Sequence, residues 1–231
     1  MSAPGGSAAR SASALEALDD VTRRLRRECP WDREQDERSI VPHTVEEAYE
    51  LADAAQRGDD AKLIDELGDV LFQVHFLSLL LEERGAGDLS AVADGCRTKL
   101  VRRHPHVFAG AEAADAGAVL RNWDAIKQGE DGRERGIFGE VPENLPAPLY
   151  ARKVLRRADS AGHAVAAPEP IEQVRLEADR VTAAGGQEER FHAVGELLFA
   201  SVAEARRLKV DPELALRAAA DRYRARVEAT A

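Results

Sequence analysis

Helical periodicity, broken at short intervals by glycine and proline, is the feature that most constrains the fold of this chain. Alternating runs of Val, Ile, Thr or Tyr bounded by turn residues, which indicate β-strands, are nearly absent. Aromatic residues make up only 5% of the sequence, while Ala, Leu, Glu and Arg recur throughout. This bias favours packed helices over sheets. The sequence therefore predicts an all-α fold.

Start and stop signals divide the helical pattern into segments. Aspartate or serine precedes several of them, and glycine or proline follows most. Residues 29–32, which contain a proline, are expected to form a loop. One predicted helix begins between residues 39 and 44 and ends at residue 57. The other predicted helices cover residues 14–27, 60–84, about 89–104, 118–127, 149–160, 171–184, 188–207 and 212–228.

The chain is predicted to contain two similar helical units. Residues 67–72 (LGDVLF) resemble residues 194–199 (VGELLF), and each segment lies on the second helix of a pair. Such a repeat indicates duplication and a pseudo-symmetric bundle. The expected organisation is a disordered tail at 1–13, an N-terminal unit at 14–110, a connector at 111–148 and a C-terminal unit at 149–231.

The charge and the cysteine content limit which partners and which cellular compartment the sequence predicts. The net charge is −10, which excludes the basic footprint of a general nucleic-acid binder. The longest apolar stretch, residues 70–81, is too short to span a membrane, and the polar N-terminus lacks the apolar core of a secretory signal. Cys29 and Cys96 do not form a disulfide or metal pattern. The sequence predicts a cytoplasmic protein that binds neither nucleic acid nor membranes.

Two acidic pairs dominate the first half of the chain. Glu47 and Glu50 lie three residues apart on one predicted helix, and Glu66 and Asp69 lie three apart on the next. Residues with this spacing share a helix face. If the two helices are antiparallel neighbours across the turn near Gly58, four carboxylates converge and need a divalent cation. Oxygen ligands of this type suit Mg²⁺ or Mn²⁺.

Simpler interpretations of the acidic pairs stay open. Acidic residues on helices commonly form a solvated face, and Thr44 and Glu47 have the spacing of a capping box, which would give Glu47 a structural role. Gly68 stands inside a helix, where glycine costs about 1 kcal/mol relative to alanine. Such a glycine indicates that a neighbouring helix or a ligand comes close to the carboxylates.

A basic cluster ends the fourth predicted helix of this half. Lys99, Arg102 and Arg103 fall within five residues of an otherwise acidic chain. Arginine binds phosphate oxygens bidentately and lysine acts as a mobile point charge, so the cluster suits a polyphosphate. The alternative is compensation of the helix dipole by cations in the last turn. Carboxylates together with such cations are what metal-assisted phosphoryl chemistry requires.

These motifs, in this order, resemble the MazG family. Its EExxE signature matches residues 46–50 and its ExxD signature matches residues 66–69. The similarity extends to CPWD at residues 29–32 with Gln35, to RRHPHVF at residues 102–108, and to parts of the connector. It covers roughly residues 15–228.

The resemblance implies tandem MazG-like helical bundles, a homodimer, and hydrolysis of a nucleoside triphosphate substrate to monophosphate and pyrophosphate with Mg²⁺, Mn²⁺ being an alternative. It also implies site residues. The metal ligands would be Glu47, Glu50, Glu66 and Asp69; Glu46 would bind water or orient a ligand; Lys99, Arg102 and Arg103 would contact phosphates; and Trp31 would lie near the base.

The second half departs from the family signature. Aligned on the repeat, Ala193 and Glu196 stand where Glu66 and Asp69 stand, and Arg180 takes the place of Glu50 beside Glu177. We therefore expect a structural or dimerising unit there. Two rival functions remain: a dUTP/dCTP or phosphoribosyl-ATP pyrophosphatase of the same superfamily, or a non-catalytic nucleotide- or metal-sensing protein.

Overall fold

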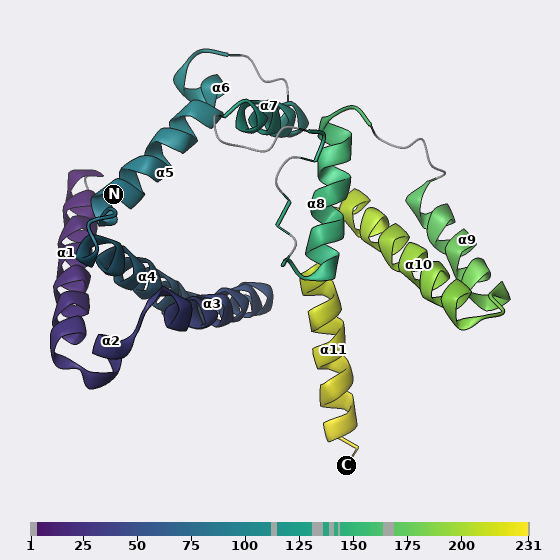
Figure 1. Ribbon diagram of the computed structural model, residues 1–231, viewed down its shortest axis with the longest axis horizontal. Coiled ribbons are helices and arrows are strands. Elements are labelled where there is room, and N and C mark those ends of the chain that lie inside the picture. The colour runs from purple at the N-terminus through teal and green to yellow at the C-terminus, as the bar shows by residue number, and fades with distance from the viewer. Residues whose placement is uncertain are drawn as a thin grey trace. The chain divides into compact units, whose positions relative to one another are not determined.

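The computed structural model describes residues 4–111, 115–130, 136–138, 141–142, 144–163 and 169–230. Every regular element in these ranges is a helix, which confirms the predicted all-α class (Figure 1). The chain divides into two compact units, Met1–Arg102 and Arg103–Ala231. Residues 111–148, predicted as a connector, thus fall within the second unit. None of the described helices is both long enough and apolar enough to cross a membrane.

The first unit is built around a pair of long helices. Chain reversal occurs at Gly58, whose φ of 67° is left-handed, and the Asp59 carboxylate then caps the next helix by accepting from the Lys62 amide at 3.0 Å. Both signals were predicted from the sequence. The helices of this unit are α1 (Pro4–Glu28), α2 (Pro30–Glu34), α3 (Glu37–Arg57), α4 (Asp60–Glu83) and α5 (Leu89–Arg103), the last of which reaches the unit boundary.

Two predicted boundaries in this unit are wrong. Helix α1 begins at Pro4, so residues 4–13 are helical and not a disordered tail. Proline at the first helical position and the alanine-rich sequence that follows explain this extension, because both favour helix locally. Residues 30–34 form the short helix α2 where a loop was expected, again with proline at its first position. The first three residues of the predicted tail lie outside the described residues.

Helix α3 also begins earlier than predicted. The Asp36 carboxylate accepts from the Ser39 amide at 2.9 Å, and the Ser39 hydroxyl accepts from the Asp36 amide at 2.9 Å. This reciprocal capping box starts the helix about three turns before Glu47. Thr44 instead contacts the Ile40 carbonyl within the helix at 3.4 Å. The alternative in which Thr44 and Glu47 form a capping box is therefore wrong, and Glu47 is not used as a cap.

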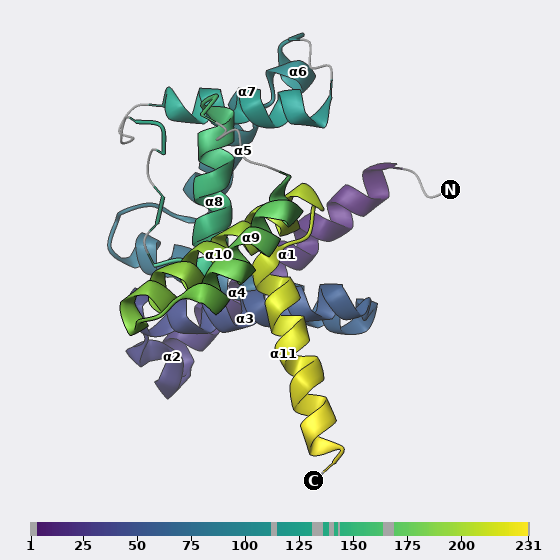
Figure 2. The ribbon, with the colours of Figure 1, turned by 90° about the vertical axis from the view of Figure 1, so that its right-hand side faces the viewer.

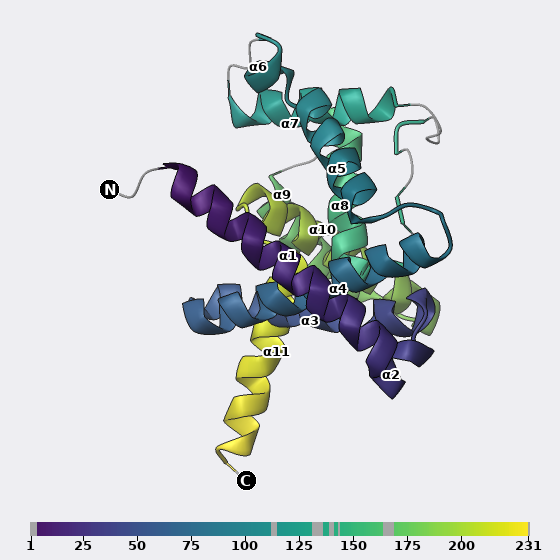
Figure 3. The ribbon, with the colours of Figure 1, turned by 90° about the vertical axis from the view of Figure 1, so that its left-hand side faces the viewer.

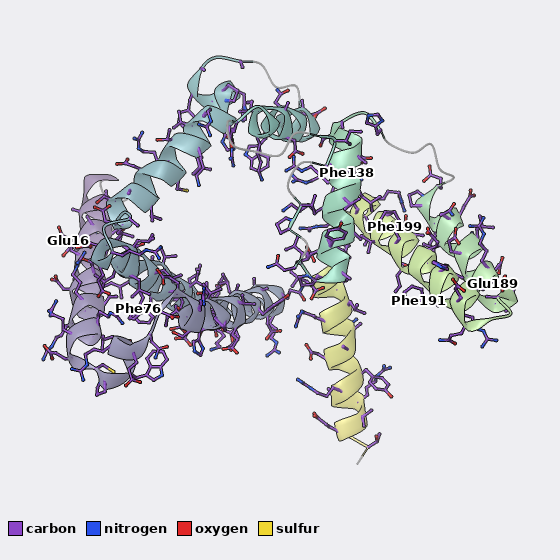
Figure 4. The ribbon with its side chains drawn as sticks, in the orientation of Figure 1. Glu16, Phe76, Phe138, Glu189, Phe191 and Phe199 are labelled. Carbon is purple, nitrogen blue, oxygen red and sulfur yellow. The ribbon has the colours of Figure 1, made fainter. Side chains whose placement is uncertain are left out.

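The core of the first unit lies on α4. Phe76 is fully buried and packs with Ile40 of α3 and with Leu80, and Phe72 joins them (Figure 4). Helix α4 also contacts α1, as Figure 3 shows. Arg23 of α1 binds the Glu82 carboxylate through two nitrogens, at 2.9 and 2.6 Å. Helix α4 is thus packed on one side by α3 and on another by α1.

The second unit contains its own helix pair. Helices α9 and α10 pack side by side as α3 and α4 do, and α10 also contacts α8 (Figure 2). Helix α11 starts as predicted, with the Asp211 carboxylate accepting from the amides of Glu213 and Leu214 and proline at the first position. The helices are α6 (Pro105–Phe108), α7 (Ala116–Gln128), α8 (Ala147–Ser160), α9 (Pro170–Ala183), α10 (Gln187–Arg207) and α11 (Pro212–Glu228).

Candidate metal centre

The α3–α4 pair brings the two acidic motifs together. The turn at Gly58 folds α4 back along α3, so the middle of one helix faces the middle of the other (Figure 1). Glu47 lies on the central turns of α3, and Glu66 and Asp69 lie on the second and third turns of α4. Side chains separated by 19 residues or more thereby meet across a helix interface.

Three carboxylates form what we call the carboxylate cluster: Glu47, Glu66 and Asp69. One oxygen from each lies within 4.8 Å of the other two. Glu66 is only 1% exposed, Glu47 is half-buried and Asp69 is exposed, so the cluster runs from the helix interface to solvent. Among the residues that the structure describes, this is the one group of three or more such side chains close enough to share an ion.

Burial and mutual repulsion make this cluster electrostatically unfavourable without a cation. Burial raises the pKa of Glu47, and the negative charges of Asp69 and Glu50 and the contact with Glu66 raise it further. The raised pKa means that Glu47 resists ionisation beside its neighbours. A divalent cation would reverse this preference by attracting all three carboxylates. The donor set, which is entirely oxygen, fits Mg²⁺ or Mn²⁺.

Lys62 is a member of the site that the sequence analysis missed. Its ammonium forms an ion pair with the buried carboxylate of Glu66 and lies 3.2 Å from Asp65. Hydrogen bonds to Glu66 and Asp65 raise the pKa of Lys62. The i, i+4 spacing to Glu66 was the signal that could have identified it. Lys62 therefore supplies positive charge to the carboxylate cluster from within the protein.

Two predicted acidic residues lie outside the cluster. Glu50 is exposed, one turn beyond Glu47, and its carboxylate is not among the converging oxygens, although its charge contributes to the raised pKa of Glu47. Glu46 is exposed and lies 3.2 Å from the His43 ring. Of the three glutamates in residues 46–50, Glu47 is thus the one whose carboxylate lies in the cluster.

The predicted substrate-binding residues lie on helices other than α3 and α4, which carry the cluster. Trp31 of α2 is 52% exposed and lies edge-on to the His43 ring, with centroids 6.1 Å apart. Lys99 and Arg102 are exposed on α5, a helix without a buried side chain. Arg103 belongs to the second unit, where it binds both oxygens of Glu130 at 2.8 and 2.6 Å.

Trp123 of α7 is a further aromatic residue that the sequence analysis did not assign to the site. Three cationic groups lie over its ring, with the Arg103, Lys127 and Arg156 charges 5.1, 5.0 and 5.8 Å from the centroid. Cations at this range interact favourably with the indole face. Arg103 is thus held by both a carboxylate and an aromatic ring.

The corresponding position in the second unit holds an internal cation. Glu177 of α9 is 2% exposed, and its Oε1 accepts from Arg180 at 2.8 Å and from Gln173 at 2.5 Å. Arg180 stands where the repeat places Glu50 in the first unit. Ala193 supplies no oxygen on the facing helix, and Glu196 is exposed. The guanidinium of Arg180 therefore compensates the buried carboxylate of Glu177.

The fold and the site together define a class: an all-α protein in which a pair of helices brings three carboxylates together as candidate ligands for a divalent cation. The comparisons with known proteins specify which family. The model of the MazG nucleotide pyrophosphohydrolase domain matches residues 35–108, which include the whole carboxylate cluster.

Three curated relatives extend the similarity beyond that domain. The chain is similar to the nucleoside triphosphate pyrophosphohydrolase of Escherichia coli (strain K12), with 36% identity over 92% of this chain and 85% of that protein. It is 36% identical to the nucleoside triphosphate pyrophosphohydrolase/pyrophosphatase MazG of Thermotoga maritima over 90% of this chain and 82% of that protein. For the Mycobacterium tuberculosis nucleoside triphosphate pyrophosphohydrolase, 36% identity covers 68% of this chain and 48% of that protein. This chain belongs to the MazG family, and the predicted resemblance and enzyme class are confirmed.

Proposed function

We propose that this protein hydrolyses nucleoside triphosphates to nucleoside monophosphates and pyrophosphate in a Mg²⁺-dependent reaction. The observation that carries the proposal is the convergence of Glu47, Glu66 and Asp69 within 4.8 Å. The names of the E. coli and T. maritima relatives support the same reaction. Water adds to the α- or the β-phosphorus, the bond from that phosphorus to the bridging oxygen breaks, and nucleoside monophosphate and pyrophosphate separate.

The carboxylate cluster would hold the divalent cation. When bound there, such an ion neutralises phosphate charge and lowers the pKa of water. Glu66 is the anchor of the proposed site, because its burial fixes the carboxylate and Lys62 orients it. Asp69 is exposed and can meet an incoming triphosphate. Glu50 lies near enough to affect Glu47 and could complete the coordination after a rotamer change.

The remaining roles inferred from the resemblance stay predictions. Lys99, Arg102 and Arg103 would bind phosphate oxygens, and Arg103 would exchange part of its contact with Glu130 for the substrate. Trp31 has the exposed ring needed to stack on a base. Glu46 would orient the attacking water if its contact with His43 opens.

We further propose that the second unit is structural. The Arg180–Glu177 ion pair supports this, because a guanidinium already neutralises the carboxylate that a cation would otherwise need to neutralise. The free thiols of Cys29 and Cys96 are consistent with a cytoplasmic enzyme. A dUTP/dCTP or phosphoribosyl-ATP pyrophosphatase would use the same cluster, so assays with dUTP, dCTP and phosphoribosyl-ATP separate these reactions.

A homodimer is the proposed assembly. Helix α4 leaves Ile64, Leu67, Leu71 and Val74 between 36% and 72% exposed, at spacings of three and four residues. This is the apolar seam of a helix that packs against another helix. The contacts with α1 and α3 do not cover it, so a second copy of the chain is the proposed partner.

The test of the proposed function is pyrophosphate release from a panel of nucleoside triphosphates, with and without Mg²⁺. Asp69→Asn and Glu196→Gln form a matched pair, because both positions are exposed and equivalent in the repeat. We expect Asp69→Asn to lose roughly 100-fold or more in kcat and Glu196→Gln to keep wild-type activity. Equal loss in both variants would refute a site confined to the first unit. Absence of hydrolysis from every nucleotide by folded protein would favour the sensing function.

A further inference from the structure

A second concave site lies wholly within the second unit. A pocket of about 450 Å³ opens between α8 and α10, a size suited to a small-molecule ligand. Of the six lining residues that the structure describes, none is acidic and four are cationic, although the chain as a whole carries a net charge of −10. The lining residues are Leu145, Leu149, Arg152, Lys153, Arg156 and Arg206.

The spacing of the lining residues on α8 explains how the pocket wall forms. Leu149, Arg152 and Arg156 follow one another at three and four residues, so they share one face of the helix. Arg206 comes from the last turn of α10, which packs against α8 (Figure 2). Two separate helices therefore contribute positive charge to the same hollow.

Each arginine of the wall is fixed by an aspartate that does not line the pocket. Arg152 pairs with Asp211, which is itself engaged as the cap of α11. Arg206 pairs with Asp159. These pairs hold the guanidinium groups in place before any ligand arrives, which reduces the entropy cost of binding.

The third pair is the most deeply anchored. Arg156 Nη1 lies 3.2 Å from Asp124 Oδ1, and Asp124 is 1% exposed and also accepts from the Ser160 hydroxyl at 2.8 Å. A guanidinium has five N–H donors, and one carboxylate uses at most two of them. The wall therefore keeps donor capacity for a second anion in spite of its ion pairs.

We propose that this pocket binds the diphosphate group of a small phosphorylated molecule, independently of divalent cations. Arginine forks bind phosphate oxygens bidentately, and a lysine adds a mobile charge. A diphosphate offers enough oxygens to contact α8 and α10 at the same time, which a single phosphate does less well. Leu145 and Leu149 add an apolar surface against which an organic part of the ligand can pack. This pocket belongs to the second unit and is lined by cations, whereas the carboxylate cluster belongs to the first unit and is acidic.

The test is isothermal titration calorimetry of the full chain with inorganic pyrophosphate and with ADP, both in EDTA. Chelation prevents phosphate from binding through a metal at the carboxylate cluster. The double variant Lys153→Gln/Arg206→Gln removes two wall charges but leaves the buried Asp124 with its partners. The matched control is Arg207→Gln, the next residue on α10, which pairs with Glu204 and does not line the pocket. Thermal unfolding checks that each variant is folded.

We expect the double variant to raise Kd by roughly tenfold or more, because charge-assisted hydrogen bonds are lost, and Arg207→Gln to leave Kd unchanged. Tighter binding of ADP than of pyrophosphate would identify a nucleoside diphosphate as the ligand class, and equal binding would identify the diphosphate alone. Lack of saturable binding in EDTA would overturn the proposal. So would equal weakening by the control, or loss of binding in Glu66→Gln, which tests the other site.

Discussion

At the scale of single residues, the buried carboxylate of Glu66 determines how the metal centre is arranged. A carboxylate that is 1% exposed needs a charge partner, and Lys62 is the partner within the chain. Glu47 and Asp69 add negative charge to the same place. The single positive charge of Lys62 can thus neutralise one of the three carboxylates but not all three.

Lys62→Met tests this division of charge. Without metal, we expect the variant to unfold more easily, because the buried carboxylate of Glu66 loses its ion-pair partner. With Mg²⁺ the loss should be smaller, since the cation replaces the missing charge. Thermal unfolding in EDTA and in Mg²⁺ measures both. Asp65→Asn, which removes only the exposed partner of Lys62, is the control, and an equal loss with and without Mg²⁺ would contradict the account.

Much of the site could be predicted residue by residue, and the limits have physical causes. The three-residue spacing within each acidic pair predicted that Glu47, Glu66 and Asp69 face one another across the two helices, and the structure brings them together. Spacing alone could not show that the Glu50 carboxylate lies outside the cluster, because the rotamer of each side chain and the packing of the two helices decide which oxygens converge. The partners of Arg103 were not predictable, since Glu130 is 27 residues away and contact between them depends on tertiary structure.

At the scale of helices, local chemistry predicted ends better than beginnings. Gly58 and Asp59 act at the α3–α4 turn as expected, because a left-handed glycine and a capping aspartate are local signals. The start of α3 was predicted between residues 39 and 44, which is too late, and Pro42 lies inside the observed helix. The reciprocal cap of Asp36 and Ser39 starts the helix before that proline, and the helix continues through it.

Gly68 and Gly195 occupy equivalent positions in α4 and α10, and they form a matched test of function. A Cβ added at either position would meet nothing within 4 Å. Alanine should therefore stabilise either helix by up to about 1 kcal/mol. Beside Asp69, however, we expect Gly68→Ala to reduce pyrophosphate release, because the substrate needs that space. Gly195→Ala should be fully active. Full activity of Gly68→Ala would mean that the glycine does not serve the ligand.

The stability that the contact between α1 and α4 contributes should depend on pH. Hydrogen bonds from Arg23 lower the pKa of Glu82 below its ordinary value of 4.5. A carboxyl group with a lowered folded-state pKa stabilises the fold at pH above 4.5, and this contribution is lost as the pH falls through the lowered pKa. Glu82→Gln should therefore reduce stability at pH 7 and have little effect near pH 2. Urea unfolding across this range measures the difference.

The control for Glu82 is Glu28→Gln, which removes a pair within α1 only. It should change stability less than Glu82→Gln at neutral pH. A difference between Glu82→Gln and wild type that stays constant down to pH 2 would show that the α1–α4 contact does not depend on this carboxylate.

At the scale of the whole molecule, helix α4 of the first unit and helix α10 of the second each leave an apolar seam exposed. Phe191, Val194 and Leu198 of α10 are 75%, 41% and 60% exposed, at the positions that correspond to Ile64, Leu67 and Leu71 of α4. Phe191 is labelled in Figure 4. The duplicated sequence therefore repeats an exposed surface as well as a helix pair. Exposed seams of this kind indicate association.

Ile64→Glu/Leu71→Glu tests the proposed homodimer. Two charges in the α4 seam should convert the dimer to monomers, since their burial at an interface would be unpaired. Sedimentation velocity measures the change. Val227→Glu, on an exposed position of α11, is the control and should leave the mass unchanged. A wild-type protein that sediments as a monomer at all concentrations would refute the proposed assembly.

The most direct test of the central claim is Mn²⁺ binding followed by electron paramagnetic resonance. The spectrum of free Mn²⁺ reports the unbound ion, so binding can be measured without any substrate. We expect wild-type protein to bind Mn²⁺ and Mg²⁺ to displace it, and Glu66→Gln to lose this binding while Glu177→Gln retains it. Wild-type affinity in Glu66→Gln would contradict the account, because the buried carboxylate would then not hold the metal.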